Sequence, residues 1–153
     1  MTRDGGCRKP YGVSNIHLIN HALARVHLTA LRDESTSSRT FRRRLNRLGE
    51  ILFLEASAGL ETEELPVRTP LAITRGFRLR RAIVLSPILR AGLGLMVGIL
   101  PLAPDAVVAH LGIARNEATA RPEPYYAKLP AILPEAEVFV LDCRSERRPS
   151  TRS

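Results

Sequence analysis

The sequence is poor in cysteine, in aromatic residues and in long apolar runs. It has no tryptophan, and its two cysteines, Cys7 and Cys143, lie near opposite ends without metal-site spacing, so we interpret both as free thiols. The longest uncharged apolar stretch, residues 91–103, is shorter than the roughly 20 residues that cross a membrane. The first ten residues have no apolar core, which argues against a secretory signal. We therefore expect a cytoplasmic protein with no membrane partner.

Lysine is also scarce, because only Lys9 and Lys128 occur, and yet the net charge is +8. The positive charge therefore comes almost entirely from arginine. A basic surface attracts nucleic acid, anionic lipid or phosphorylated small molecules. Frequent arginine is equally typical of proteins encoded by GC-rich genomes, so the charge alone does not choose a partner.

A length of 153 residues is enough for one domain with its own core. Residues 1–15 contain glycine and proline without periodicity and are predicted to form a flexible arm. Apolar residues recur at helical spacing over 18–31, and again from Thr36 or Ser37, either of which would cap the second helix, to about Gly59. The two apolar stripes consist of Ile19, Leu23, Val26 and Ala30, and of Phe41, Leu45, Leu48 and Leu52.

The segments that follow predict an α/β domain. Residues 65–80 alternate between apolar and polar and contain two prolines and a glycine, which indicates a hairpin or an irregular extended arm. Nearly all-apolar runs predict parallel core strands near 82–86, 107–113 and 137–142. A helix over residues 92–102 would join the first two strands. We therefore expect a parallel sheet covered by helices on both faces.

An arginine and two glycines stand where the first strand meets this helix, in the stretch "SPILRAGLG". In open α/β sheets, ligands bind beyond the carboxyl ends of the strands, and Arg90 lies at such an end. Gly92 and Gly94 would let backbone N–H groups approach an anion. The stretch matches neither the dinucleotide-binding fingerprint nor a P-loop. An anion site and an ordinary tight turn are therefore both open at this point.

Two further charged residues follow the other strands, because Arg115 comes after the second apolar run and Asp142 ends the third. The carboxyl ends of parallel strands meet at one edge of a sheet. Arg90 and Arg115 would then converge on one crevice with Asp142 on its rim, which shifts the odds toward an anion site. The four histidines form no metal constellation, and no arrangement for nucleophilic catalysis is found.

Six stretches of the chain resemble the uracil phosphoribosyltransferase family, in the same order and spacing, over about residues 17–142. They read "HALARVHLTALRDESTSSRTFRR", "EASAGL", "SPILRAGLGL", "AHLGIARNEAT", "PEPYYAKLP" and "VFVLD". The combination of "PILRAGLG" with "RNE" and "PYYAKLP" is highly specific to this family.

The resemblance implies a type I phosphoribosyltransferase fold, a Rossmann-like parallel sheet flanked by helices. It also implies the transfer of ribose 5-phosphate from phosphoribosyl pyrophosphate (PRPP) to uracil, which gives UMP and diphosphate, with Mg²⁺ bound together with PRPP. The residues that it assigns to PRPP are Arg90, Gly92, Gly94, Arg115 and Asp142. It assigns no residue of this chain to uracil or directly to a metal, and it implies a homodimer or a larger homo-oligomer.

The resemblance stops after Asp142, where "CRSERRPSTRS" stands in place of the family's glycine-rich loop for the ribose 5-phosphate. Ala114 also replaces an aromatic residue of the family. We therefore divide the chain into a flexible arm (1–15), a partial phosphoribosyltransferase domain (16–142) that is incomplete at its C-terminus, and a basic tail (143–153). We expect this truncated chain to form no detectable UMP, and its tail to come from a shifted reading frame or a misassembled end.

Two alternatives to a phosphoribosyltransferase are considered. An arginine-rich nucleic-acid-binding protein would explain the net charge of +8, but the arginines are spread along the chain and no binding motif accompanies them. A non-catalytic partner subunit, which assembles with a full-length relative, is compatible with the sequence. A salt-dependent oligonucleotide shift would separate the first alternative from the enzyme.

Overall fold

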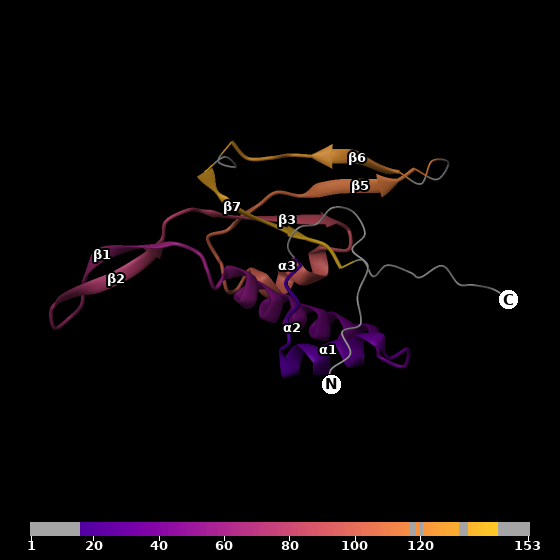
Figure 1. Cartoon of the computed structure of the whole chain (residues 1–153), viewed down its shortest axis with the longest axis horizontal. Helices are drawn as coiled ribbons and strands as arrows, with labels where there is room; N and C mark the ends of the chain where they lie inside the picture. The colour runs from indigo at the N-terminus through magenta and orange to yellow at the C-terminus, as the bar shows by residue number, and fades with distance from the viewer. Residues whose placement is uncertain (1–15, 117–118, 120, 132–134, 144–153) are drawn as a thin grey trace, which may run out of the picture.

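The computed structural model describes residues 16–116, 119, 121–131 and 135–143, and it has the mixed α/β fold that the sequence predicts (Figure 1). The helices are α1 (Ala22–Arg32), α2 (Ser38–Ser57) and α3 (Leu93–Ile99). The strands are β1 (Thr62–Arg68), β2 (Ile73–Leu79), β3 (Ile83–Leu89), β4 (Val107–Val108), β5 (Leu111–Arg115), β6 (Pro122–Ala127) and β7 (Glu137–Leu141). Within the described ranges, no helix combines the length and the apolar character that crossing a membrane requires.

The turn between α1 and α2 is fixed by short polar side chains. Asp33 accepts hydrogen bonds from the backbone N–H and the hydroxyl of Ser35, and these bonds lower the pKa of its carboxyl. The Thr36 hydroxyl donates to the carbonyl of Ala30 at 2.7 Å. Ser37 then caps α2 by accepting from the N–H of Thr40. The sequence located this cap correctly, because Ser and Thr favour helix starts for this reason.

Helix α1 begins later than predicted, and two residues of its apolar stripe are largely exposed. It begins at Ala22 rather than at residue 18, with the His21 ring accepting from the N–H of Leu23. Leu23 and Val26 of the predicted stripe are 57% and 54% exposed. The reason is that α1 packs on α2, on the side away from the sheet, so its apolar side chains do not reach the core (Figure 1).

Helices α2 and α3 approach each other closely through glycines. A Cβ at Gly49 would lie 2.7 Å from the carbonyl O of Leu95, and one at Gly98 only 2.1 Å from that of Asn46. The buried residues of α2 are therefore Gly49 and Phe53. The predicted stripe was read from large apolar residues, and of these only Leu45 packs against the core cluster. The predicted helix is confirmed, but glycines, which the stripe did not include, form its closest contact with α3.

Strand β3 is the centre of the main sheet. Strand β7 lies parallel on one side of β3, and β4 and β5 lie parallel on the other. The core cluster forms where this sheet meets α2 and α3, and its buried members are Phe53, Ile83, Leu85, Leu95, Ile99, Ala103 and Leu141. The rings of Phe53 and Phe139 meet edge to face, with centroids 5.0 Å apart.

Two details of the sheet were not predicted. The single strand expected near 107–113 is interrupted and forms β4 and β5, with the N–H of Ala109 donating to the carbonyl of Leu85 between them. The proline-rich segment 121–130 contains β6, a strand that the sequence analysis did not predict, and β6 pairs antiparallel with β5. Proline is tolerated there because β6 is the last strand on this side of the described sheet. The backbone N–H groups on its outer side have no neighbouring strand to which they would donate.

The described helices lie on one face of the sheet, whereas the sequence predicted helices on both (Figure 1). Alternate residues of a strand point to opposite faces. In β7, Phe139 and Leu141 point to the helices, and Val138 and Val140 are 42% and 59% exposed on the other face.

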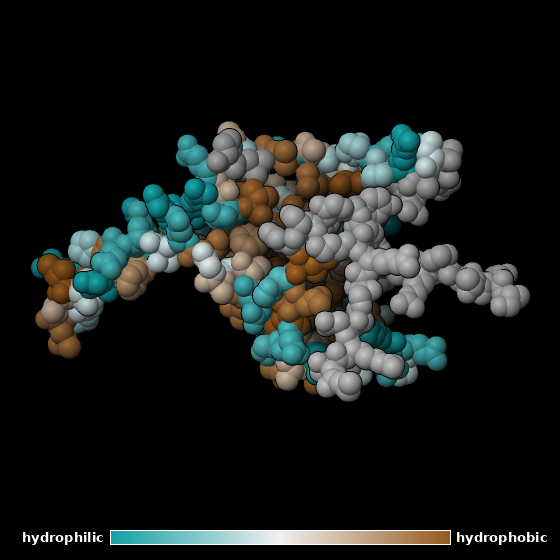
Figure 2. Space-filling model, viewed as in Figure 1, coloured by the Kyte–Doolittle hydropathy of each residue, from teal (hydrophilic) through white to brown (hydrophobic). Residues whose placement is uncertain are grey.

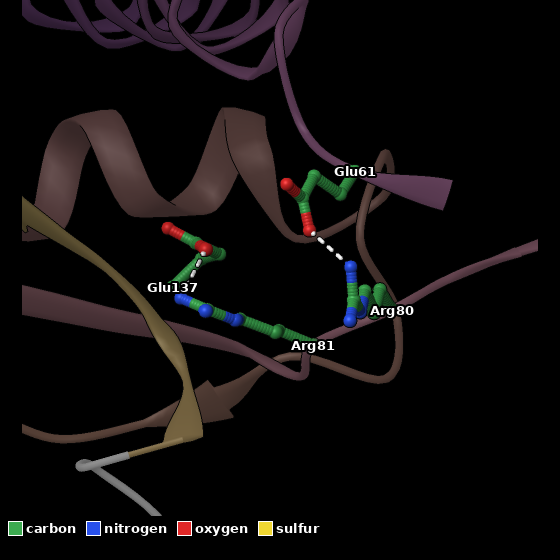
Figure 3. Close-up of polar contacts among 4 residues, drawn as sticks. All are labelled: Glu61, Arg80, Arg81 and Glu137. Carbon is green, nitrogen blue, oxygen red and sulfur yellow. Dashed lines mark hydrogen bonds and ion pairs between the residues drawn. The ribbon is translucent and has the colours of Figure 1, made fainter. Parts of the chain in front are cut away.

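Strands β1 and β2 form the hairpin that the sequence allowed, and it projects away from the rest of the fold (Figure 1). Its strands are joined across by ion pairs between glutamates of β1 and arginines of β2, namely Glu63–Arg78 and Glu64–Arg75. At its base, Arg80 contacts Glu61 at 3.0 Å, and Arg81 contacts Glu137 of β7 at 3.2 Å (Figure 3). These pairs are largely exposed, so each contributes at most about 1 kcal/mol.

Candidate functional site

The candidate site lies where the parallel strands end. The register pairs Pro87 of β3 with Leu141 of β7, and Leu89 of β3 with Gly112 of β5. The carboxyl ends of all three strands therefore lie at the same edge of the sheet, as the sequence predicted, and this is the edge at which α/β proteins bind ligands.

The loop after β3 carries Arg90 at this edge. The Leu89–Arg90 peptide bond is cis, and the Arg90 side chain is exposed. The N–H of Gly92 donates to the carbonyl of Ile88 at 2.8 Å, and that of Leu93 donates to the carbonyl of Arg90 at 3.3 Å. The turn is thus fixed by its own hydrogen bonds before α3 begins at Leu93.

Close packing explains why both loop positions are glycine, and the sequence did not indicate this. A Cβ at Gly92 would lie 2.2 Å from the carbonyl O of Leu141 and 2.8 Å from the N of Ile88. A Cβ at Gly94 would lie 2.3 Å from Cδ2 of Leu45. Gly92 therefore lets the loop contact the end of β7, and its N–H is used within the turn. The role of Gly92 and Gly94 in binding PRPP stays a prediction.

The residues after β7 reach the same loop. The Cys143 thiol donates to the carbonyl of Ala91 at 3.1 Å. Partial burial is the main cause that raises the pKa of this thiol, and the nearby Asp142 carboxylate raises it further, so the thiol stays protonated and can donate. Asp142, between Leu141 and Cys143, is exposed at the same edge. We expected Cys143 to belong to an unrelated tail, and nothing in the sequence indicated this contact.

Arg115 ends β5, but the strands are staggered. Leu89 of β3 is paired with Gly112 of β5. Arg115 lies three residues beyond Gly112, which is roughly 10 Å along the strand. Its side chain lies outside what the structure describes, so its convergence with Arg90 stays a prediction. The next residue, Asn116, donates from its amide N to the carboxylate of Glu123 at 2.8 Å.

The electrostatics of this edge suit an anion. Among the described residues, Arg90 has no carboxylate within ion-pair distance, so its guanidinium can bind a ligand. The described histidines, cysteine and carboxylates include no group of three that could hold a metal. What the described edge offers to a ligand is therefore the positive charge of Arg90.

Comparisons with known proteins agree with this arrangement. The family model for uracil phosphoribosyltransferase matches residues 18–144. The uracil phosphoribosyltransferase of Corynebacterium diphtheriae is 44% identical over 127 residues, which cover 83% of this chain and 60% of that protein. That of Ureaplasma parvum serovar 3 is 40% identical over 126 residues, which cover 82% of this chain and 61% of that protein. A solved protein from Aquifex aeolicus matches with a TM-score of 0.76 and 38% identity, over 81% of this chain and 60% of that one.

The fold and the loop at its strand edge define a type I phosphoribosyltransferase domain. The chain belongs to the uracil phosphoribosyltransferase family. It spans about three fifths of the length of the curated relatives that it matches. The family match does not favour the arginine-rich nucleic-acid-binding alternative.

Proposed function

We propose that the carboxyl edge of the sheet is the PRPP site of a uracil phosphoribosyltransferase, the enzyme that converts uracil and PRPP into UMP and diphosphate, and that this chain by itself binds PRPP without forming detectable UMP. The observation that carries this proposal is the exposed guanidinium of Arg90, which follows the buried strand β3 and has no carboxylate partner among the described residues. The membership of the family supports the choice of PRPP and uracil over other phosphorylated substrates.

The chemistry assigns Arg90 to the leaving group. Negative charge grows on the diphosphate oxygens as the bond to the ribose breaks. A guanidinium that is already in position stabilises this charge without reorganisation. The turn that carries Arg90 is fixed by the hydrogen bond from Gly92 to Ile88 and by the contact of Gly92 with Leu141, so the positioning of Arg90 depends on β3 and β7. We assign the second diphosphate contact to Arg115.

The donors at this edge are compatible with Mg²⁺ that is bound mainly by substrate. Asp142 supplies a carboxylate at the edge, and Mg²⁺ commonly combines one or two carboxylates with phosphate oxygens and water. When bound with PRPP, Mg²⁺ would neutralise part of the diphosphate charge. Asp142 would orient that complex beside Arg90.

The uracil site is not assigned to any residue of this chain. We therefore expect that the chain by itself forms no detectable UMP. A chromatographic assay for UMP with Mg²⁺ and PRPP tests it. The free thiol of Cys143 is typical of a reducing compartment, which supports our proposal that the protein is cytoplasmic.

Replacing Arg90 should weaken PRPP binding. We expect Arg90→Gln to raise the Kd for Mg²⁺-PRPP at least about tenfold, because a charge-assisted contact to the diphosphate is lost. Isothermal titration calorimetry measures this effect. Arg39→Gln is the matched control, since it removes the same charge from an exposed position on α2. Equal affinities of the two variants would rule out Arg90 as a PRPP ligand.

We also propose that the hairpin formed by β1 and β2 contacts a second copy of the chain. Its far end exposes apolar side chains, since Leu71 and Ile73 are 97% and 72% exposed (Figure 2), and Phe77, nearer the base, is 64% exposed. A projecting hairpin with an apolar tip is typical of an interaction surface. The homo-oligomer that the family resemblance implies supplies a partner for it.

Charges at the hairpin tip should therefore dissociate the oligomer. We expect the double variant Leu71→Glu/Ile73→Glu to sediment as a monomer at concentrations where the unaltered chain sediments as a dimer or larger species. Analytical ultracentrifugation gives the two masses. A control, Leu18→Glu, places the same charge at an exposed position outside the hairpin. Unchanged association of the hairpin variant would contradict the proposal.

A further inference from the structure

A groove runs between the three helices, away from the edge that carries Arg90. Its volume is about 840 Å³, which is within the range of small-molecule sites. Its apolar lining is formed by Leu23 of α1, Val97 of α3 and Pro101. None of its lining residues belongs to the Arg90 loop or to β7, so it is separate from the proposed PRPP site.

The groove is strongly basic. Its lining includes Arg43, Arg44 and Arg47 of α2 and His27 of α1, and Glu50 is its one acidic lining residue among those described. Glu50 is already bound by Arg47, whose guanidinium nitrogen lies 2.8 Å and 2.7 Å from the two carboxylate oxygens. Neither Arg43 nor Arg44 has a described carboxylate within ion-pair distance. Two guanidiniums therefore share the groove without a counter-charge from the described fold.

The contact between His27 and Arg44 adds a third basic group. The Nη1 of Arg44 lies 3.2 Å from Nδ1 of His27. A guanidinium can only donate, so Nδ1 accepts this bond and carries no proton. Partial burial of the ring, followed by the charges of Arg44 and Arg47, lowers the pKa of His27, while Glu50 opposes this effect. An anion in the groove would offset the charges of the two arginines and favour protonation of Nδ1, which would end its hydrogen bond with Arg44 and leave that guanidinium to the anion.

The form of the groove selects a class of ligand. It is a concave site of small-molecule size, and its described lining has no phenylalanine, tyrosine or tryptophan on which a nucleic acid base could stack. Arginine guanidiniums bind phosphate oxygens with two donors each. We propose that this groove binds a small anion with adjacent phosphate groups, through Arg43 and Arg44.

Inorganic tripolyphosphate is a suitable probe, because it has adjacent phosphates and no base or sugar. NMR follows the His27 ring signals during pH titrations with and without the probe, and His27→Gln identifies those signals by their loss. We expect tripolyphosphate to raise the pKa of His27 and to shift the backbone amide signals of Thr40 and Val97, which line the groove. The same shifts give the Kd.

Two variants locate the site. We expect Arg43→Gln/Arg44→Gln to raise the Kd at least about tenfold, measured on the Thr40 amide. Arg43→Gln alone, at an exposed position, should weaken binding without a risk to the fold. Arg39→Gln lies on the same helix but outside the groove and should change the Kd less than about threefold.

The proposed PRPP site is tested separately, because Arg90→Gln should leave these shifts unchanged. The proposal is overturned if tripolyphosphate leaves His27 and Thr40 unaffected, or if Arg39→Gln weakens binding as much as the double variant, which would indicate general attraction to a basic surface. It is also overturned if a single-stranded RNA oligonucleotide shifts the groove signals and tripolyphosphate does not.

Discussion

Gly98→Ala should destabilise the fold by about 2–3 kcal/mol. The new Cβ would lie 2.1 Å from the carbonyl O of Asn46 and 2.7 Å from its carbonyl carbon. Both are backbone atoms in the middle of α2, which cannot move without separating α2 from α3. In an unobstructed helix, alanine would stabilise by about 1 kcal/mol over glycine, so a net loss identifies the steric contact.

Urea unfolding followed by circular dichroism measures this effect. The matched control is Gly59→Ala, because a Cβ at Gly59 meets no atom within 4 Å. We expect that control to change the free energy of unfolding by less than about 0.5 kcal/mol. Equal stabilities of the two variants would mean that α2 and α3 do not pack as closely as described here.

Leu85→Ala should destabilise the fold by about 3–4 kcal/mol. Leu85 is 0% exposed, and it lies in the core cluster at the centre of β3. Truncation would leave a cavity between the sheet and the helices, and the surrounding core can collapse only in part. Strand β3 also carries Arg90, so we expect weaker PRPP binding in this variant as a secondary effect.

The comparison for Leu85→Ala is the same substitution at Leu18, which is 85% exposed. Thermal and urea unfolding should show a change below about 0.5 kcal/mol for Leu18→Ala. A loss below about 1 kcal/mol for Leu85→Ala would contradict the position of Leu85 in the core.

Local patterns were sufficient to predict much of this fold from the sequence. The cap of α2 was predicted at Thr36 or Ser37, because a hydroxyl there satisfies a free N–H group, and Ser37 is the residue that forms it. Strands β3 and β7 were recognised because they are short apolar runs with β-branched residues. The hairpin of β1 and β2 was one of two stated possibilities, and its pairing confirms the first.

The features that the sequence did not predict depend on how the helices and strands pack together. The stripe of Leu23 and Val26 is regular, but periodicity does not say whether a helix packs on the sheet or on another helix. The contact face of α2 was missed because glycine contributes no hydrophobic signal, although Gly49 is buried. Strand β6 was missed because its prolines weaken the strand pattern, and an edge position tolerates them.

The candidate site was predicted in part. The order of strand and arginine was enough to place Arg90 at the carboxyl edge, and the register of β3 and β7 brings Asp142 to the same edge. The need for glycine at position 92 could not be predicted. It arises because the loop packs against the carbonyl of Leu141, which is distant in the sequence. The basic groove could not be predicted, because it forms only when three helices pack together. The sequence showed only the run of arginines in α2.

The most direct test of PRPP binding at the sheet edge is an amide NMR map of the labelled chain, titrated with Mg²⁺-PRPP. We expect the largest shifts in residues 88–94 and 141–143, which form the Arg90 loop and the end of β7. The same titration of Arg90→Gln should require at least about tenfold more PRPP for half-saturation. Shifts confined to the groove of α1, α2 and α3, or no saturable shifts at all, would contradict a PRPP site at the carboxyl edge of the sheet.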